Sequence, residues 1–157
     1  MTGDLSIRPY QDSDAAALSV LYEASVRGLG VRDYSVAQIE AWASLTPSAE
    51  ALAARMADGR TRLVAVMDHV AGFIDVEADG HIDLLYVSPG AVGQGVARTL
   101  LETAEAVARL AGAGRLYAEA SETARPVFER LGYSTTVRRD FEVAGVPIHN
   151  WVVEKAF

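Results

Sequence analysis

Apolar and polar positions alternate along this chain in two periods, one typical of strands and one typical of helices. Alternation at residues 5–8, and short apolar runs bounded by turn residues elsewhere, predict strands at residues 5–8, 62–67, 70–77, 81–87, 115–120, 133–143 and 146–155. Helical spacing predicts helices over residues 13–26, 36–43, 48–58, 96–111 and 123–131. Gly28 and Gly30 are expected to break the first helix, because glycine is a poor helix former. The expected order is strand, helices, three strands, helix, strand, helix and two strands.

The stretch from residue 84 to residue 101 passes from strand to helix through a glycine loop. An apolar run ends at Val87, and Gly93 and Gly95 precede a helical pattern that begins near Val96. The first N–H groups of a helix have no partner within it and lie at the positive end of its dipole, so they can bind an anion such as a phosphate. A tight strand-to-helix turn is the alternative role of such a lone Gly-x-Gly.

Length, charge and cysteine content narrow the class of protein. The 157 residues fit one domain, residues 1–157, with no linker or composition shift inside it. A net charge of -7, from 14 basic and 21 acidic side chains, argues against a nucleic-acid partner. Without cysteine there is no disulfide, thiolate zinc site or cysteine nucleophile, which fits a cytoplasmic protein. The first residues lack the basic start and continuous apolar core of a secretory signal, and no apolar run approaches the roughly 20 residues of a membrane span. The sequence therefore predicts no membrane association.

Two motifs carry a family resemblance that extends over nearly the whole chain. The first is Val87-Ser88-Pro89 followed by Gly93-Gln94-Gly95-Val96-Ala97, and the second is the run of residues 124–133 that ends in Leu-Gly-Tyr. Together they resemble the GNAT superfamily of acyl-CoA-dependent N-acyltransferases. The polar Gln or Arg of the family's loop pattern is replaced here by Val92, so a side-chain contact is lost while the backbone N–H groups remain.

The resemblance implies an α/β fold of α+β character. Its centre would be a mixed, mostly antiparallel sheet of about seven strands with a splayed parallel pair, flanked by helices. The two parallel strands would be residues 81–87 and 115–120, and acetyl-CoA would lie between them as co-substrate, with no metal ion. The resemblance assigns the coenzyme to Leu85, Val87, Val92, Gly93, Gln94, Gly95, Val96, Ala97, Arg98, Ser121 and Phe128.

Two of these positions differ from what the family often carries. Ser121 stands where an Asn often contacts the pantetheine arm, and capping of the next helix is its alternative role. Phe128 stands where a Tyr often protonates the leaving thiolate, and phenylalanine has no proton to donate. Tyr117, Tyr133 or water would supply the proton, or the thiolate would leave without one.

Direct acyl transfer to an amine also needs a base and an acceptor site. Asp83 and Glu77 are the predicted catalytic carboxylates, and His81 is a weaker candidate on the same sheet face as Asp83. Asp33, Tyr34 and Trp42 are predicted to bind the acceptor. The alternative is that Trp42 packs in the core while Tyr34 extends its hydroxyl toward solvent.

The sequence therefore predicts an N-acetyltransferase that transfers acetyl from acetyl-CoA to a primary amine of a small molecule or peptide. The alternative is a noncatalytic acyl-CoA-binding sensory or regulatory module on the same fold, which Val92 and Phe128 favour. Either protein could form a homodimer.

Overall fold

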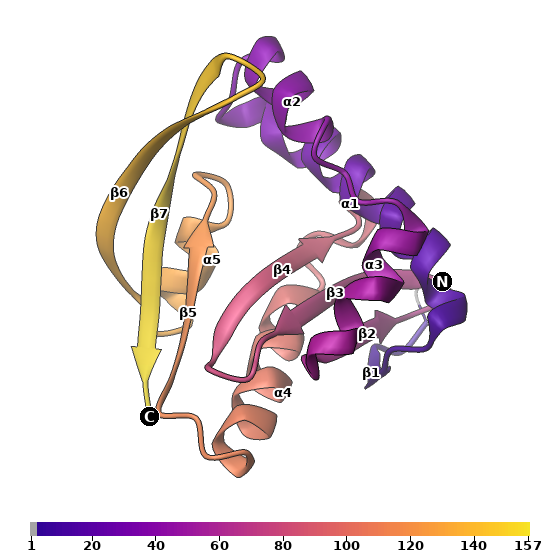
Figure 1. The fold of residues 1–157 in the computed structure, drawn as a ribbon. Coiled ribbons are helices and arrows are strands. Elements are labelled where there is room, and N and C mark those ends of the chain that lie inside the picture. Colours follow the sequence, from indigo (N-terminus) through magenta and orange to yellow (C-terminus); the bar gives the residue numbers. More distant parts are fainter. Residues whose placement is uncertain (1–2) are drawn as a thin grey trace.

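The computed structural model describes residues 3–157 and consists of one seven-stranded mixed sheet with helices on both faces (Figure 1). The strands are β1 (Ser6–Pro9), β2 (Thr61–Val66), β3 (Val70–Val76), β4 (His81–Val87), β5 (Arg115–Ala120), β6 (Ser134–Val143) and β7 (Val146–Ala156). The α-helices are α1 (Ala15–Leu29), α2 (Val36–Ala43), α3 (Ala49–Arg55), α4 (Val96–Leu110) and α5 (Arg125–Arg130). The sheet order is β1-β2-β3-β4-β5-β7-β6, and only β4 and β5 run parallel. This confirms the predicted fold class.

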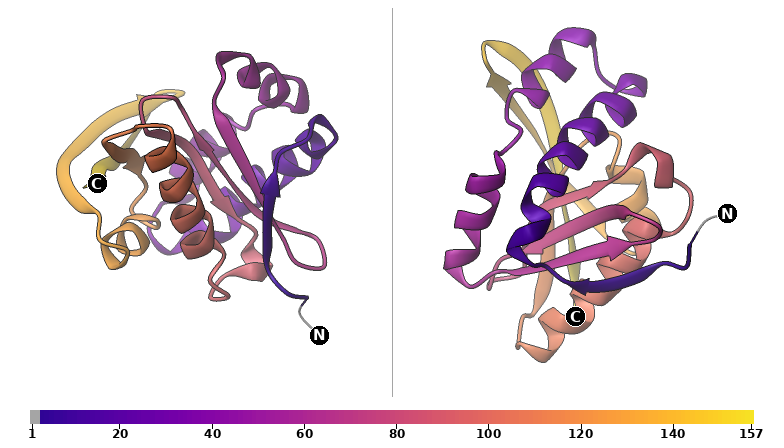
Figure 2. Two further views of the ribbon diagram at one scale, coloured as in Figure 1. Left: turned by 90° about the horizontal axis from the view of Figure 1, so that it is seen from below. Right: turned by 90° about the vertical axis from the view of Figure 1, so that its right-hand side faces the viewer.

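Two hydrophobic clusters cover the two faces of the sheet, and α1 and α4 lie on opposite faces (Figure 2). Val64 and Phe73 pack toward α1, whereas their strand neighbours Ala65 and Ile74 pack toward α4. Successive side chains of a strand point to opposite faces, so the alternating apolar positions in β2 and β3 serve both clusters. The continuous apolar runs of these strands are explained by burial on both sides.

Helix α1 passes through Gly28 and ends at Leu29, so the prediction that Gly28 breaks the helix was wrong. A Cβ atom at Gly28 would lie 2.8 Å from the Pro89 ring, closer than real contacts allow. The missing side chain lets the loop after β4 pack directly against α1. Gly28 therefore permits a close approach of the loop, although a glycine inside a helix costs about 1 kcal/mol.

A buried ion pair joins the neighbouring strands β2 and β3. Arg62 donates through Nε and Nη2 to the two carboxylate oxygens of Asp75, at 2.6 and 2.9 Å, and through Nη1 to the Leu52 carbonyl of α3 at 2.9 Å. Both side chains are fully buried. Paired charges with these additional hydrogen bonds are tolerated in a protein interior, and here they fix α3 against the sheet.

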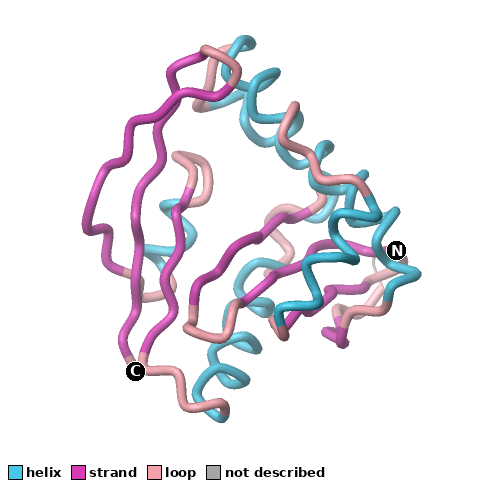
Figure 3. The backbone as a smooth tube through the Cα atoms, in the orientation of Figure 1, coloured by secondary structure: helices cyan, strands magenta, loops and turns pink. Residues whose placement is uncertain are grey.

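Strands β4 and β5 form a fork. Their backbones pair only at His81 with Tyr117 and at Ile82 with Ala118, after which they separate toward their carboxyl ends (Figure 3). The sheet therefore opens in its middle, between a β4 edge and a β5 edge that lack a strand partner there. Among residues 3–157, none of the helices combines the length and apolar character that a membrane span requires.

Candidate functional site

A cavity of about 940 Å³ fills the fork between β4 and β5. Its walls come from the carboxyl end of β4, the glycine loop with the start of α4, the connection that follows β5, α5, and the segment from α1 to α2. Polar and charged groups at strand ends converge on such an opening, which is a common position for a binding site in sheets of this kind.

The glycine loop opens directly into this cavity. Gly93 and Gly95 have φ angles of 81° and 80°, which favour glycine, and a Cβ atom at either position would meet no protein atom within 4 Å. The first hydrogen bond of α4 is donated by Thr99 to the Gly95 carbonyl at 3.0 Å. The N–H groups at the first three positions of α4 therefore have no partner in the helix and are available to an anion.

Ten of the eleven residues predicted to bind the coenzyme line this cavity. The exception is Gln94, whose amide donates to the Gly90 carbonyl at 3.3 Å and supports the loop. Val92 lines the cavity with a half-exposed apolar side chain. The residues that line it are Leu85, Val87, Val92, Gly93, Gly95, Val96, Ala97, Arg98, Ser121 and Phe128.

Ser121 lines the cavity and also supports the turn that leads into α5. Its hydroxyl accepts a hydrogen bond from the N–H of Ala124, the residue before α5 begins, at 3.0 Å. Phe128 is 3% exposed and packs edge-to-face on Tyr133. The hydroxyl of Tyr133 donates to Glu105, and that of Tyr117 donates to Asp79, both away from the cavity.

The three predicted acceptor residues all line the other end of the cavity. Tyr34 and Trp42 pack edge-to-face with ring centroids 5.4 Å apart, and the Asp33 carboxylate accepts a hydrogen bond from Thr123 at 2.9 Å. The Tyr34 hydroxyl accepts from the Glu122 N–H at 2.8 Å and donates to the His149 carbonyl at 3.3 Å. Burial raises the pKa of Tyr34 to about 12, so this hydroxyl remains protonated at neutral pH.

Glu122 lines the cavity beside Tyr34 and was missed by the sequence reasoning. His149 Nε2 lies 2.8 Å from its Oε2, the Trp151 indole N–H donates to the same oxygen, and Arg125 donates to Oε1 at 3.1 Å. Burial opposes ionisation, but the hydrogen bonds from Trp151 and His149 and the charge of Arg125 outweigh it and lower the pKa of Glu122. A carboxylate has about four lone-pair sites, so one remains free for a ligand.

The only sequence signal for Glu122 was its place at the carboxyl end of a strand beside the fork. His149 and Trp151 reach it from β7, which neighbours β5 in the sheet but follows it by about thirty residues in the chain. No local pattern connects them.

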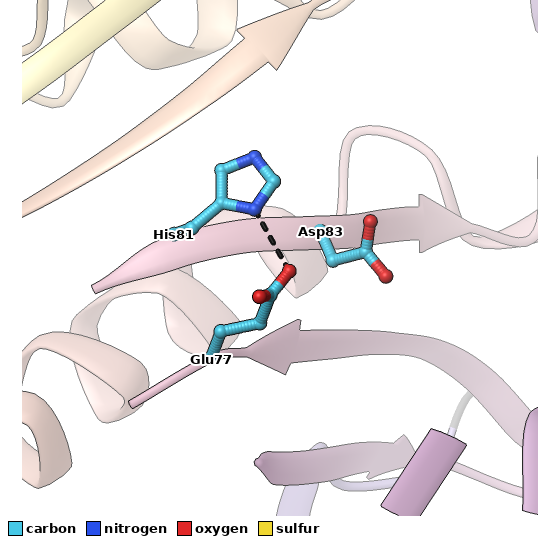
Figure 4. A group of neighbouring side chains, drawn as sticks. All are labelled: Glu77, His81 and Asp83. Carbon is cyan, nitrogen blue, oxygen red and sulfur yellow. Dashed lines mark hydrogen bonds and ion pairs between the residues drawn. The ribbon is translucent and has the colours of Figure 1, made fainter. Parts of the chain in front are cut away.

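The two predicted catalytic carboxylates, Asp83 and Glu77, do not line the cavity. They lie with His81 on one face of the sheet, near the base of the fork (Figure 4). Asp83 accepts from Arg60 at 2.7 Å and from Arg55 at 3.5 Å. Carboxylate and imidazole groups gathered in this way also suit a divalent cation, but here the arginines already supply positive charge beside Asp83.

His81 joins the strands at the base of the fork. Its Nε2 lies 2.6 Å from Glu119 of β5, and its Nδ1 lies 2.9 Å from Glu77. The hydrogen bond with Glu119 has the largest effect on the pKa of His81. Together with the hydrogen bond to Glu77 it outweighs the effect of burial and raises this pKa from 6.5 to about 9. His81 is therefore an imidazolium ion at neutral pH, held between two carboxylates.

We expect His81 to make the stability of the protein depend on alkaline pH. Because its pKa is higher in the folded chain, the stabilisation is complete below pH 6.5 and is lost as the pH rises through about 9. Allowing for solvent screening at the partly exposed carboxylates, we expect a loss of roughly 1–2 kcal/mol. Urea unfolding at pH 7 and pH 10 measures it, and His81→Gln should lack this part of the pH dependence. An equal loss in both proteins would contradict the role of His81.

Comparisons with known proteins agree with this geometry. A family model described as an acetyltransferase (GNAT) domain matches residues 31–155. An uncharacterized N-acetyltransferase of Escherichia coli K12, YafP, is 29% identical over 148 residues, which cover 94% of this chain and 93% of YafP. The crystal structure of a GCN5-related N-acetyltransferase from Rhodopseudomonas palustris has a TM-score of 0.91 and 34% identity, over 100% of this chain and 98% of that one. PaiA N-acetyltransferase from Thermoplasma acidophilum, in complex with coenzyme A, shares the fold with a TM-score of 0.78 and 20% identity, over 98% and 99%.

Proposed function

Because this chain belongs to the GNAT acetyltransferase family, we propose that it transfers an acetyl group from acetyl-CoA directly to a primary amine of a small molecule or peptide. The single observation that carries this proposal is the glycine loop, which presents free helix N–H groups to a cavity in the fork of the sheet. The continuous sheet from β1 to β7 supports one domain, residues 1–157, as the acting unit.

Charged side chains line both ends of the cavity, and their distribution suits the two substrates even though Arg32 lies among the carboxylates of the acceptor end. Arg98 and Arg130 line the end formed by α4 and α5, where the coenzyme phosphates would lie on the loop. Asp33 and Glu122 line the end that α2 and β7 enclose, where a cationic amine would be attracted. The pantetheine arm would lie between these ends, against the unpaired β4 edge at Leu85 and Val87.

We assign proton removal from the amine to Glu122. Attack on the thioester requires a neutral amine, and a carboxylate can take its proton directly or through one water. Glu122 lines the cavity, remains ionised and has a free lone-pair site, whereas Asp83 and Glu77 lie outside the lining. The thiolate of coenzyme A leaves with a proton from water, since Phe128 has none to give.

Calorimetry with acetyl-CoA, followed by thiol-release assays on a panel of amines, tests the proposal. We expect acetyl-CoA binding and release of coenzyme A that depends on an added amine. Binding without turnover on any amine would favour the noncatalytic acyl-CoA-binding module, to which Phe128 and Val92 point. Failure to bind acetyl-CoA would contradict both functions.

A further inference from the structure

The segment that connects α1 to α2 is tied across the fork and closes the acceptor side of the cavity. Asp33 accepts a hydrogen bond from the Thr123 hydroxyl, and the Tyr34 hydroxyl accepts one from the Glu122 N–H, both in the connection between β5 and α5. Gln38 of α2 donates to the Pro147 carbonyl of β7 at 3.1 Å. Figure 1 shows α2 reaching the turn between β6 and β7. A long polypeptide would have to break these ties before it could lie across the fork.

The size of the cavity sets a second limit on the acceptor. Its volume of about 940 Å³ is at the upper end of ordinary small-molecule pockets, which hold about 300–1,000 Å³. The same space must contain the acetylated pantetheine arm. Only a small amine fits in what remains.

The walls on the acceptor side are apolar and aromatic, with two carboxylates among them. Asp33 has no ion-pair partner among residues 3–157, so its charge would attract an ammonium group and repel a carboxylate. Arg125 already pairs with Glu122, and the exposed Arg32 also lines this end. Trp42 and Tyr34 present ring surfaces that suit an apolar body. The apolar and aromatic lining residues here are Val26, Leu29, Tyr34, Ile39, Trp42 and Tyr86.

We propose that the acceptor is a small primary amine with an apolar, preferably aromatic, body and no carboxylate, and that free amino acids and peptides are poor acceptors. This inference rests on the proposed acetyl transfer and narrows its substrate class. It combines the closed acceptor side, the limited volume and the two carboxylates.

Phenethylamine and phenylalanine test the inference as a matched pair, because they differ only in the carboxylate. We expect kcat/KM for phenethylamine to exceed that for phenylalanine by at least about 100-fold, since like charges at close quarters cost several kcal/mol. A tripeptide that begins with phenylalanine should be turned over no faster than phenylalanine. Equal kcat/KM for phenethylamine and either of the other two would overturn the inference and leave acetyl transfer standing.

Asp33→Asn tests the electrostatic part of the inference. The new amide oxygen can still accept the hydrogen bond of Thr123, so the tie is kept while the charge is removed. We expect the preference for phenethylamine over phenylalanine to fall by about tenfold. Glu142→Gln, which removes an exposed carboxylate of β6 outside the cavity, is the control and should leave the preference unchanged. An unchanged preference in Asp33→Asn would contradict the role of its charge.

Calorimetry separates this inference from the proposed function. Phenethylamine and phenylalanine are titrated separately into the protein saturated with coenzyme A, so no turnover is needed. Tighter binding of phenethylamine would support the amine class even if no acetyl transfer were found, which would count against the proposed function alone. Equal affinities, tighter binding of phenylalanine or no binding of either would overturn the inference.

Discussion

Gly95→Trp is expected to lower the affinity for acetyl-CoA by at least about 100-fold. The indole would project into the open space before α4, where the phosphates would approach the free N–H groups. Loss of even two hydrogen bonds to a charged group, at about 1.5–3 kcal/mol each, accounts for this factor. Calorimetric titration of acetyl-CoA measures it.

Gly112→Trp is the matched control. Gly112 follows the other end of α4, has a φ of 87°, and likewise has no atom within 4 Å of an added Cβ. Both variants therefore carry the same backbone strain of about 1–2 kcal/mol, and only Gly95→Trp obstructs the cavity. Retained affinity in Gly95→Trp, or an equal loss in Gly112→Trp, would contradict the assignment of the loop to the phosphates.

Glu122→Gln is expected to lower kcat with phenethylamine by about 100- to 1,000-fold, because loss of a general base removes a factor of roughly 10²–10⁴. The amide cannot accept the amine proton, although it nearly retains the shape of the carboxylate. The affinity for acetyl-CoA should not change, since the glycine loop is untouched. Stopped-flow thiol release and calorimetry together measure the two quantities.

The pH profile of the wild-type enzyme gives a second readout. The lowered pKa of Glu122 keeps its carboxylate ionised above the ordinary glutamate value of 4.5, and activity that depends on it is lost only as the pH falls through the lowered pKa. We therefore expect no acidic limb assignable to this group between pH 5 and pH 7.

Asp83→Asn and Glu77→Gln are the comparison variants. Neither side chain lines the cavity, so we expect both to keep kcat within about threefold of the wild-type value. A large loss of kcat in either variant, together with an active Glu122→Gln, would show that Asp83 or Glu77 accepts the proton and that Glu122 does not.

Several site residues could be predicted because the sequence around them is locally ordered. The glycine loop joins a strand to a helix within about a dozen residues, and the family resemblance of this stretch assigned Leu85 and Val87, at the end of its strand, to the coenzyme. Asp33, Tyr34 and Trp42 lie within one short segment, and all three line the cavity. Contacts over such short separations follow from the helical and strand periods alone.

Contacts between segments that lie far apart in the chain could not be predicted in the same way. Whether Asp83 faces a ligand or an arginine depends on Arg60 and Arg55, which lie more than twenty residues before it. Gly28 was expected to break its helix, because nothing local showed that Pro89 would pack against it.

By itself, the sequence determined the element order, because hydrophobic periods and glycine positions encode it within a few residues. The fold class and the expectation of an anion-binding loop came from the family resemblance of two motifs. The tertiary structure decided that Glu122, rather than Asp83 or Glu77, joins Asp33 in the lining of the cavity. Glu122 obtains His149 and Trp151 as partners only because β7 returns to pair with β5, and Tyr34 meets Glu122 only because the α1–α2 connection crosses the fork. Side-chain pairing between distant segments depends on sheet order and packing, and a local sequence pattern carries no record of either.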